Sequence, residues 1–160
     1  MRGCGLAARG GRRRAFVAAA VLAGVLAGCS SPATDGDSGA NAAADGGDLV
    51  GTSWTVQSIG GRPAIDSPQS MLIFQSTTLL VGDGGCNTFS GAIGIEGGRM
   101  LIGPLASTRR ACDDAIMAQE AALLSALESV RSFQANEQVL LLFGPAGTQT
   151  VALSRTPAPL

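Results

Sequence analysis

The feature that most restricts this chain is its N-terminal segment, which is typical of an export signal and leaves few residues for a fold. Five arginines and no acidic residue accompany an apolar run of 13 residues, 15–27. As a helix this run rises about 20 Å, too short for a hydrocarbon core of roughly 30 Å but the right length for a signal-peptide core. We therefore expect one small domain of about 105 residues.

The apolar run ends in Leu26-Ala27-Gly28-Cys29, which resembles the lipobox recognised by the lipoprotein signal peptidase. We expect residues 1–28 to be removed as a lipoprotein signal peptide and Cys29 to be lipidated. Two or more acyl chains make such an anchor stable, since each buried methylene contributes roughly 0.8 kcal/mol. The alternative is a chance cysteine after an ordinary signal peptide. Arg13-Arg14 fits both a twin-arginine signal and a plain basic segment, so the export route stays open.

The sequence after Cys29 predicts a tether that holds the domain in the cell envelope, on the extracytoplasmic side of a membrane. Residues 29–48 contain no large apolar side chain, so they cannot offset their ordering entropy and should form a disordered linker. Its reach as a flexible coil is roughly 24 Å. Six arginines against twelve acids remain after Cys29, a net charge of −6 that argues against nucleic-acid binding.

The four cysteines predict one disulfide. Cys4 leaves with the signal peptide and Cys29 takes the lipid, so Cys86 and Cys112 remain as a pair in an oxidising compartment. A bond between them closes a loop of about 25 residues and contributes on the order of 3 kcal/mol. A reactive or metal-binding thiol pair is the alternative, but close spacing and histidines are missing, so we expect no metal site.

From residue 49 onward, short apolar runs alternate with turn residues about every ten positions, as in an antiparallel sheet. Gly82-Asp83-Gly84-Gly85 is predicted to form a turn. We assign the domain to 49–155 and expect a loose tail over 156–160. The expected strands lie around 54–57, 71–74, 79–81, 89–95, 100–102, 139–143 and 148–153.

One segment, 114–131, has helical spacing instead. Ile116, Leu123, Leu127 and Val130 share one face. Asp113 or Asp114 is expected to cap its start, and Arg131 lies at the negative end of its dipole. The predicted fold class is therefore α+β, a small curved, barrel-like antiparallel β-sheet with one α-helix packed on it.

Residue types that are absent restrict the chemistry. The chain has no histidine, lysine or tyrosine, which removes Ser-His-Asp and Cys-His sites, Schiff bases and phosphate-loop lysines. Carboxylates and hydroxyls remain, including the adjacent Asp113-Asp114 and the isolated Asp83, Glu96 and Glu120. Adjacent acids at a helix start are typical of a cap, with an acid/base pair as the alternative. We expect no catalytic residue and no cofactor.

Arg109-Arg110 is the only basic doublet after Cys29, and it lies close to Cys112. A loop held still by a disulfide there could bind a phosphate or a partner's carboxylate. The alternative is a solvent-facing loop without a ligand.

Two longer motifs resemble a known family. They are Gly82-Asp83-Gly84-Gly85-Cys86-Asn87-Thr88-Phe89-Ser90-Gly91 and Leu101-Ile102-Gly103-Pro104-Leu105-Ala106-Ser107-Thr108-Arg109-Arg110-Ala111-Cys112. With Trp54 near the domain start, these motifs resemble the META domain of HslJ-like heat-shock lipoproteins. The resemblance implies a small α+β fold and an association with envelope stress, drug resistance, motility or virulence, without an agreed biochemical activity.

The resemblance also suggests roles for single residues. Asn87 would fix the turn behind the glycines with its side-chain amide, and Trp54 and Phe89 would anchor the core. The chain departs from many members at Ile93, where they carry an aromatic residue, and at Arg110, where they carry methionine. We retain Asn87, Arg109 and Arg110 as a possible ligand-binding loop.

These observations favour a monomeric, non-enzymatic lipoprotein that binds an envelope protein or small ligand or maintains the envelope. One alternative is a lipid-anchored inhibitor of a lysozyme or protease. The other is a hydrolase that uses carboxylates alone, which needs two acids facing one cleft.

Overall fold

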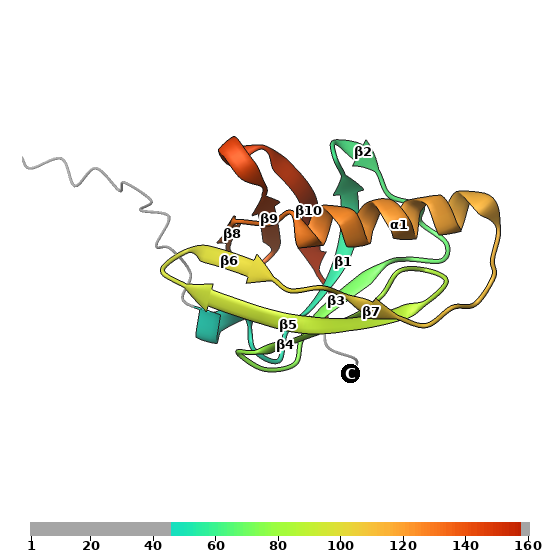
Figure 1. Ribbon diagram of the computed structural model, residues 1–160. Helices are drawn as coiled ribbons and strands as arrows, with labels where there is room; N and C mark the ends of the chain where they lie inside the picture. Colours follow the sequence, from blue (N-terminus) through green and yellow to red (C-terminus); the bar gives the residue numbers. More distant parts are fainter. Residues whose placement is uncertain (1–45, 158–160) are drawn as a thin grey trace, which may run out of the picture. The chain divides into compact units, whose positions relative to one another are not determined.

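The computed structural model describes residues 46–157 (Figure 1), so the expected signal peptide, Cys29 and most of the expected linker lie outside the described residues, as do 158–160. The elements are η1 (Gly46–Leu49), β1 (Ser53–Ile59), β2 (Arg62–Pro63), β3 (Met71–Phe74), β4 (Leu79–Asp83), β5 (Thr88–Glu96), β6 (Arg99–Ile102), β7 (Ala106–Ser107), α1 (Asp114–Glu128), β8 (Ser132–Ala135), β9 (Val139–Phe143), η2 (Pro145–Gly147) and β10 (Gln149–Arg155).

The strands form one antiparallel sheet that closes on itself. Its order is β10-β9-β8-β6-β5-β4-β3-β1, and β10 also pairs with β1, which makes a barrel of eight strands. The short β2 pairs with β1, and the short β7 pairs with β5. The prediction of a small antiparallel sheet with one helix is confirmed, and β10–β1 pairing removes the open edges that a curved sheet would leave.

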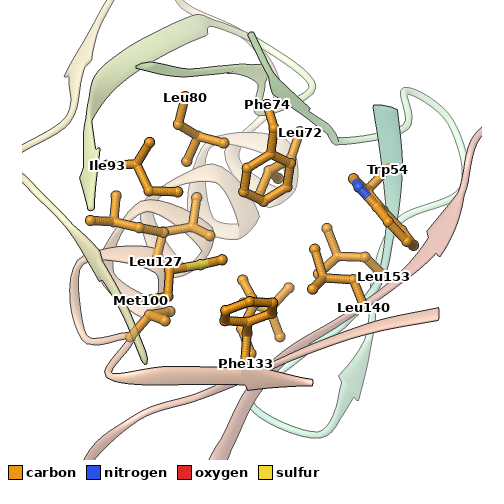
Figure 2. Close-up of a cluster of buried hydrophobic side chains, with 14 of the residues drawn as sticks. Trp54, Leu72, Phe74, Leu80, Ile93, Met100, Leu127, Phe133, Leu140 and Leu153 are labelled. Carbon is orange, nitrogen blue, oxygen red and sulfur yellow. The ribbon is translucent and has the colours of Figure 1, made fainter. Parts of the chain in front are cut away.

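Side chains that alternate in direction along the strands give the sheet a core face and an outer face. In β3 and β4, Leu72, Phe74 and Leu80 are fully buried. Their neighbours Ile73 and Val81 are half-buried and face outward. The hairpin of β3 and β4 aligns these residues across the two strands. Figure 2 shows side chains from strands on every side of the barrel pointing toward one another.

Helix α1 covers one end of the barrel. Its buried residues Leu123 and Leu127, with Val130 just beyond it, belong to the same hydrophobic core as the strand side chains. Figure 2 shows α1 behind the ring of strands, with Leu127 reaching into it. The apolar stripe read from the sequence is therefore the face that α1 packs against the barrel.

The ends of α1 agree with the sequence in part. Asp113 occupies the N-cap position, but its side chain makes no capping hydrogen bond. The Asp113 carbonyl instead accepts bonds from the amides of Ile116 and Met117. At the other end, the Arg131 guanidinium donates to the carbonyls of Glu128 and Val130. The negative end of the helix dipole favours a cation at this position.

The barrel interior is filled by its own side chains. Trp54, Phe74, Met100 and Leu140 are completely buried, and Phe89 is 3% exposed. Trp54 and Phe89 thus lie in the core, as expected for anchor residues. Small barrels of eight strands have an interior just wide enough for side chains or for one small ligand. Here side chains of the hydrophobic core occupy it, which favours a ligand site on the outer surface.

Two details differ from the sequence-based expectation. Gly82 and Asp83, expected in the turn, lie in β4. Position 82 requires glycine because a Cβ there would overlap the Phe89 ring and the Met71 carbonyl oxygen. Thr156, which was expected in a loose tail, donates its amide to the Ser53 carbonyl at 2.9 Å. Its hydroxyl also lies 2.8 Å from the Thr55 hydroxyl, so the chain stays against β1 one residue beyond β10.

The Thr52 hydroxyl is expected to stabilise the domain through two buried hydrogen bonds. It accepts a bond from Trp54 Nε1 and donates to the Leu49 carbonyl, both at 2.6 Å and buried. Thr52→Val keeps the shape but leaves the indole N–H without this acceptor, so the free energy of unfolding should fall by about 1–3 kcal/mol. Denaturant unfolding measures it. Thr148→Val, at an exposed threonine, is the control and should change stability by less than about 0.5 kcal/mol; equal effects would contradict the prediction.

Candidate functional site

The predicted disulfide is confirmed. Cys86 and Cys112 are bonded, with their Cα atoms 6.0 Å apart and a sequence separation of 26. Cys86 follows the turn after β4, and Cys112 directly precedes the start of α1. The bond therefore ties the β4–β5 turn to the segment that leads from β7 into the helix.

Local backbone chemistry places Cys86. Gly85 has a φ of +100°, a region that residues with a Cβ rarely adopt. Its amide donates to Asp83 Oδ1 at 2.7 Å, and the Gly84 amide donates to the Asn87 carbonyl at 2.8 Å. A Cβ at Gly84 would lie 2.6 Å from Glu120 Cγ, so the glycines let the turn approach α1 closely.

Asn87 joins three segments through its side chain and is 5% exposed. Its Oδ1 accepts bonds from the Thr108 hydroxyl at 2.8 Å and the Arg110 amide at 2.7 Å. Its Nδ2 donates to Glu120 Oε1 at 2.9 Å and to the Arg110 carbonyl at 3.3 Å. The side-chain amide thus holds the facing loop and α1, not only its own turn, and it has no free polar atom for a ligand.

Glu120 is the partner that the sequence did not reveal. It is 7% exposed, and its Oε2 accepts the Asn87 backbone amide at 2.7 Å. The signal was present, because Glu120 lies one turn from Ile116 and from Leu123 on the apolar face of α1. A carboxylate on such a face needs buried donors, and Asn87 supplies two of them.

Arg109 is placed outward by the same network. Its neighbours Thr108 and Arg110 are both bonded to Asn87 Oδ1, while the Thr108 amide donates to the Thr88 carbonyl at 3.1 Å. Arg109 and Arg110 are both exposed. Of the three residues proposed as a ligand-binding loop, Asn87 is the internal support and the two arginines are accessible.

A groove of about 630 Å³ lies on the outside of the barrel beside this loop. Met71, Ile73 and Val81, from β3 and β4, supply its larger apolar side chains. Ser90 and the segment 106–108 supply further lining, so the groove extends over β5 and β7 and includes Thr108, the residue before Arg109. Its volume is in the range of small-molecule sites.

A second hollow of about 290 Å³ adjoins the groove through Met71, which lines both. It is bounded by residues 51–53, at the start of β1, and by Arg155 and Thr156 at the end of β10. The Arg155 guanidinium carbon lies 5.4 Å from the centre of the Trp54 ring, a cation–π contact. The outer hollows therefore begin within a few residues of the point where the chain enters the domain.

Residues 46–157 also bear on metal binding and membrane crossing. No group of three or more His, Cys, Asp or Glu side chains there is placed to hold a metal ion. In the same range, no helix has both the length and the apolar character needed to cross a bilayer.

The fold and motifs agree with a family comparison. The model of the META domain family matches residues 47–157, most of the chain. The chain belongs to the META domain family. The match includes every strand of the barrel, the disulfide and the Asn87 network. The META resemblance seen in the sequence is therefore confirmed. No curated protein sequence matches the chain.

Solved structures share the fold of this META domain. A protein from Burkholderia xenovorans, solved by NMR, has a TM-score of 0.56 and 22% identity, covering 71% of this chain and 87% of that one. A DUF4847 family protein from Bacteroides vulgatus ATCC 8482, solved by crystallography, has a TM-score of 0.51 and 13% identity, covering 69% and 96%. At these identities the similarity supports the fold alone.

Proposed function

We propose that the protein is a lipid-anchored envelope protein whose META domain binds a ligand or partner without catalysing a reaction. One observation carries the binding role: core side chains occupy the barrel interior, while a groove of about 630 Å³ outside it is lined by Thr108, the residue before the exposed Arg109. A site that combines an apolar floor with a few placed polar groups is typical of ligand binding. The anchor rests on the lipobox-like sequence at Cys29.

The arrangement of the carboxylates favours a non-enzymatic role. Glu120 is the buried acid among residues 46–157, and both of its oxygens accept bonds from Asn87. Asp113 and Asp114 are exposed at the start of α1. A hydrolase that uses carboxylates alone needs an acid and a base poised at one substrate, and Glu120 is engaged in holding the turn.

The exposed loop at Arg109 favours one second candidate, an inhibitor of a protease. Loops that are rigid before binding lose less conformational entropy in a complex, and Asn87 and the disulfide hold this loop on both sides. An arginine at its tip would suit a protease with an acidic specificity pocket. Inhibition of a trypsin-like protease that Arg109→Ala abolishes would favour this candidate over the groove.

The lipid anchor is tested by Cys29→Ser in cells, followed by fractionation and intact-mass spectrometry. Wild-type protein should lie in the membrane fraction and have the mass of a chain that begins at Cys29 and carries diacylglycerol. Cys29→Ser should lose the lipid mass and keep residues 1–28, because the lipoprotein signal peptidase acts on lipidated cysteine.

Cys4→Ser is the matched control, since Cys4 lies inside the expected signal peptide. It should leave the mass and the membrane location of the mature protein unchanged. A wild-type chain that still begins at Met1 and carries no lipid would contradict the proposed anchor.

A further inference from the structure

We propose that the groove over β3, β4, β5 and β7 holds an acyl chain of a membrane phospholipid, with the phosphate of that lipid toward Arg109. This inference rests on the proposed lipid anchor, which keeps the domain at a bilayer surface. It goes beyond the proposed binding role by naming the class of ligand.

The groove floor suits a hydrocarbon chain. Ile73 and Val81 are cross-strand partners on the outer face, and Met71 lies two residues along β3 on the same face. All three are half-buried, and Leu79, 37% exposed, continues the outer face of β4. Apolar surface collected in a groove is stabilised when an apolar ligand covers it. Because side chains fill the barrel, an acyl chain has room here and not inside.

The end of the groove carries charges complementary to those of a phospholipid headgroup. Thr108 lines this end, and Arg109, the next residue, is exposed and backed by the Asn87 network. Asp83 lines the same end, since it pairs with both Met71 and Thr88. Arginine recognises phosphate by charge and by its planar set of donors. The Asp83 carboxylate favours a headgroup that also carries an ammonium, such as phosphatidylethanolamine.

The position where the chain enters the domain brings the groove near the bilayer. The described residues begin at Gly46, 17 positions after Cys29. Residues 51–53 line the hollow that shares Met71 with the groove. As a flexible coil, the linker expected from the sequence would span roughly 20–25 Å over this length. A lipid-linked Cys29 therefore keeps the groove within reach of neighbouring lipids.

The test uses protein purified from cell membranes and reconstituted into vesicles of phosphatidylethanolamine and phosphatidylglycerol. The vesicles contain a trace of phosphatidylethanolamine with a diazirine on one acyl chain. After illumination, peptide mass spectrometry locates the labelled residues. We expect label on segment 71–81, reduced at least about fivefold by Ile73→Glu, which places a charge on the groove floor. The matched control is Leu101→Glu, at an apolar residue 58% exposed on β6, which should leave the label on 71–81 unchanged.

The headgroup contact is tested in the same vesicles. Arg109→Glu should lower the labelling of 71–81 several-fold, whereas Arg99→Glu, at an exposed arginine of β6 that does not line the groove, should not. A diazirine-bearing diacylglycerol, which lacks the phosphate, should label less than the phosphatidylethanolamine probe. Near-UV circular dichroism checks that each variant keeps the wild-type fold.

Three results would overturn the inference: label spread evenly over the outer strands, label on 71–81 that Ile73→Glu does not reduce, or equal labelling by both probes. The intact mass of the same sample separates this inference from the anchor. A lipidated protein without groove labelling refutes the groove ligand and leaves the anchor standing. An unlipidated chain refutes the anchor whatever the label shows.

Discussion

Replacing both Cys86 and Cys112 with serine is expected to lower the free energy of unfolding by about 3.5 kcal/mol. The two residues are 26 positions apart, and the loop between them contains β5, β6 and β7. Without the bond, the unfolded chain gains the entropy of that loop, which gives the stated magnitude. For a domain of this size, the midpoint of thermal unfolding should fall by more than about 10 °C. Calorimetry measures both quantities.

The control for this prediction is wild-type protein with the disulfide reduced by a thiol reagent. It should unfold at nearly the same temperature as the double serine variant, because both lack the same crosslink. A double serine variant that melts with the oxidised wild type would contradict the stabilising role of the bond.

Asn87→Ala is expected to destabilise the domain by about 3 kcal/mol, although Asn87 contributes almost no apolar surface. The change removes four side-chain hydrogen bonds and takes one donor from the buried Glu120 carboxylate. Buried polar groups that lose their partners each cost about 1–3 kcal/mol, more when charged. Urea unfolding should show a lower midpoint with an unchanged slope.

Asn136→Ala is the matched control. Asn136 is exposed in the turn before β9, where its Oδ1 accepts bonds from the amides of Gln138 and Val139. Losing these solvent-accessible bonds should cost less than about 1 kcal/mol. If the two alanine variants lost equal stability, the Asn87 network would not have the structural importance assigned to it.

The parts of the fold that the sequence predicted are those with local signals. The β3–β4 and β9–β10 hairpins follow from apolar runs joined by turn residues, and α1 follows from its helical spacing. Strand β8 was missed, because Phe133 is the only large apolar side chain in Ser132–Ala135. The burial of Phe133 comes from its partners across β9 rather than from a pattern of its own.

The strand pairing that closes the barrel could not be predicted from the sequence, for a different reason. It depends on pairing of β1 with β10, about 100 positions apart, with a register that shifts between Val56 and Ser58. The register of such a pair is set by the packing of the whole interior, which no local window contains. The sequence therefore predicted a curved, barrel-like sheet but not which strands close it.

The candidate site was predictable in most of its residues but not in the contacts that connect them. The cysteine count pointed to Cys86 and Cys112, and the basic doublet pointed to Arg109 and Arg110. That Asn87 connects the loop to Glu120 depends on tertiary contacts 21 to 33 positions apart. The groove likewise arises from the outer faces of strands that meet only in the folded sheet.

The central claim is that Asn87 holds the arginine loop in one conformation, and hydrogen exchange at the Arg110 amide tests it most directly. This amide belongs to an exposed residue but donates to Asn87 Oδ1 at 2.7 Å. NMR should show it protected in wild-type protein and exchanging much faster in Asn87→Ala, while the amides of the β3–β4 hairpin stay protected. An Arg110 amide that exchanges in wild-type protein as fast as in an unstructured peptide would contradict the claim.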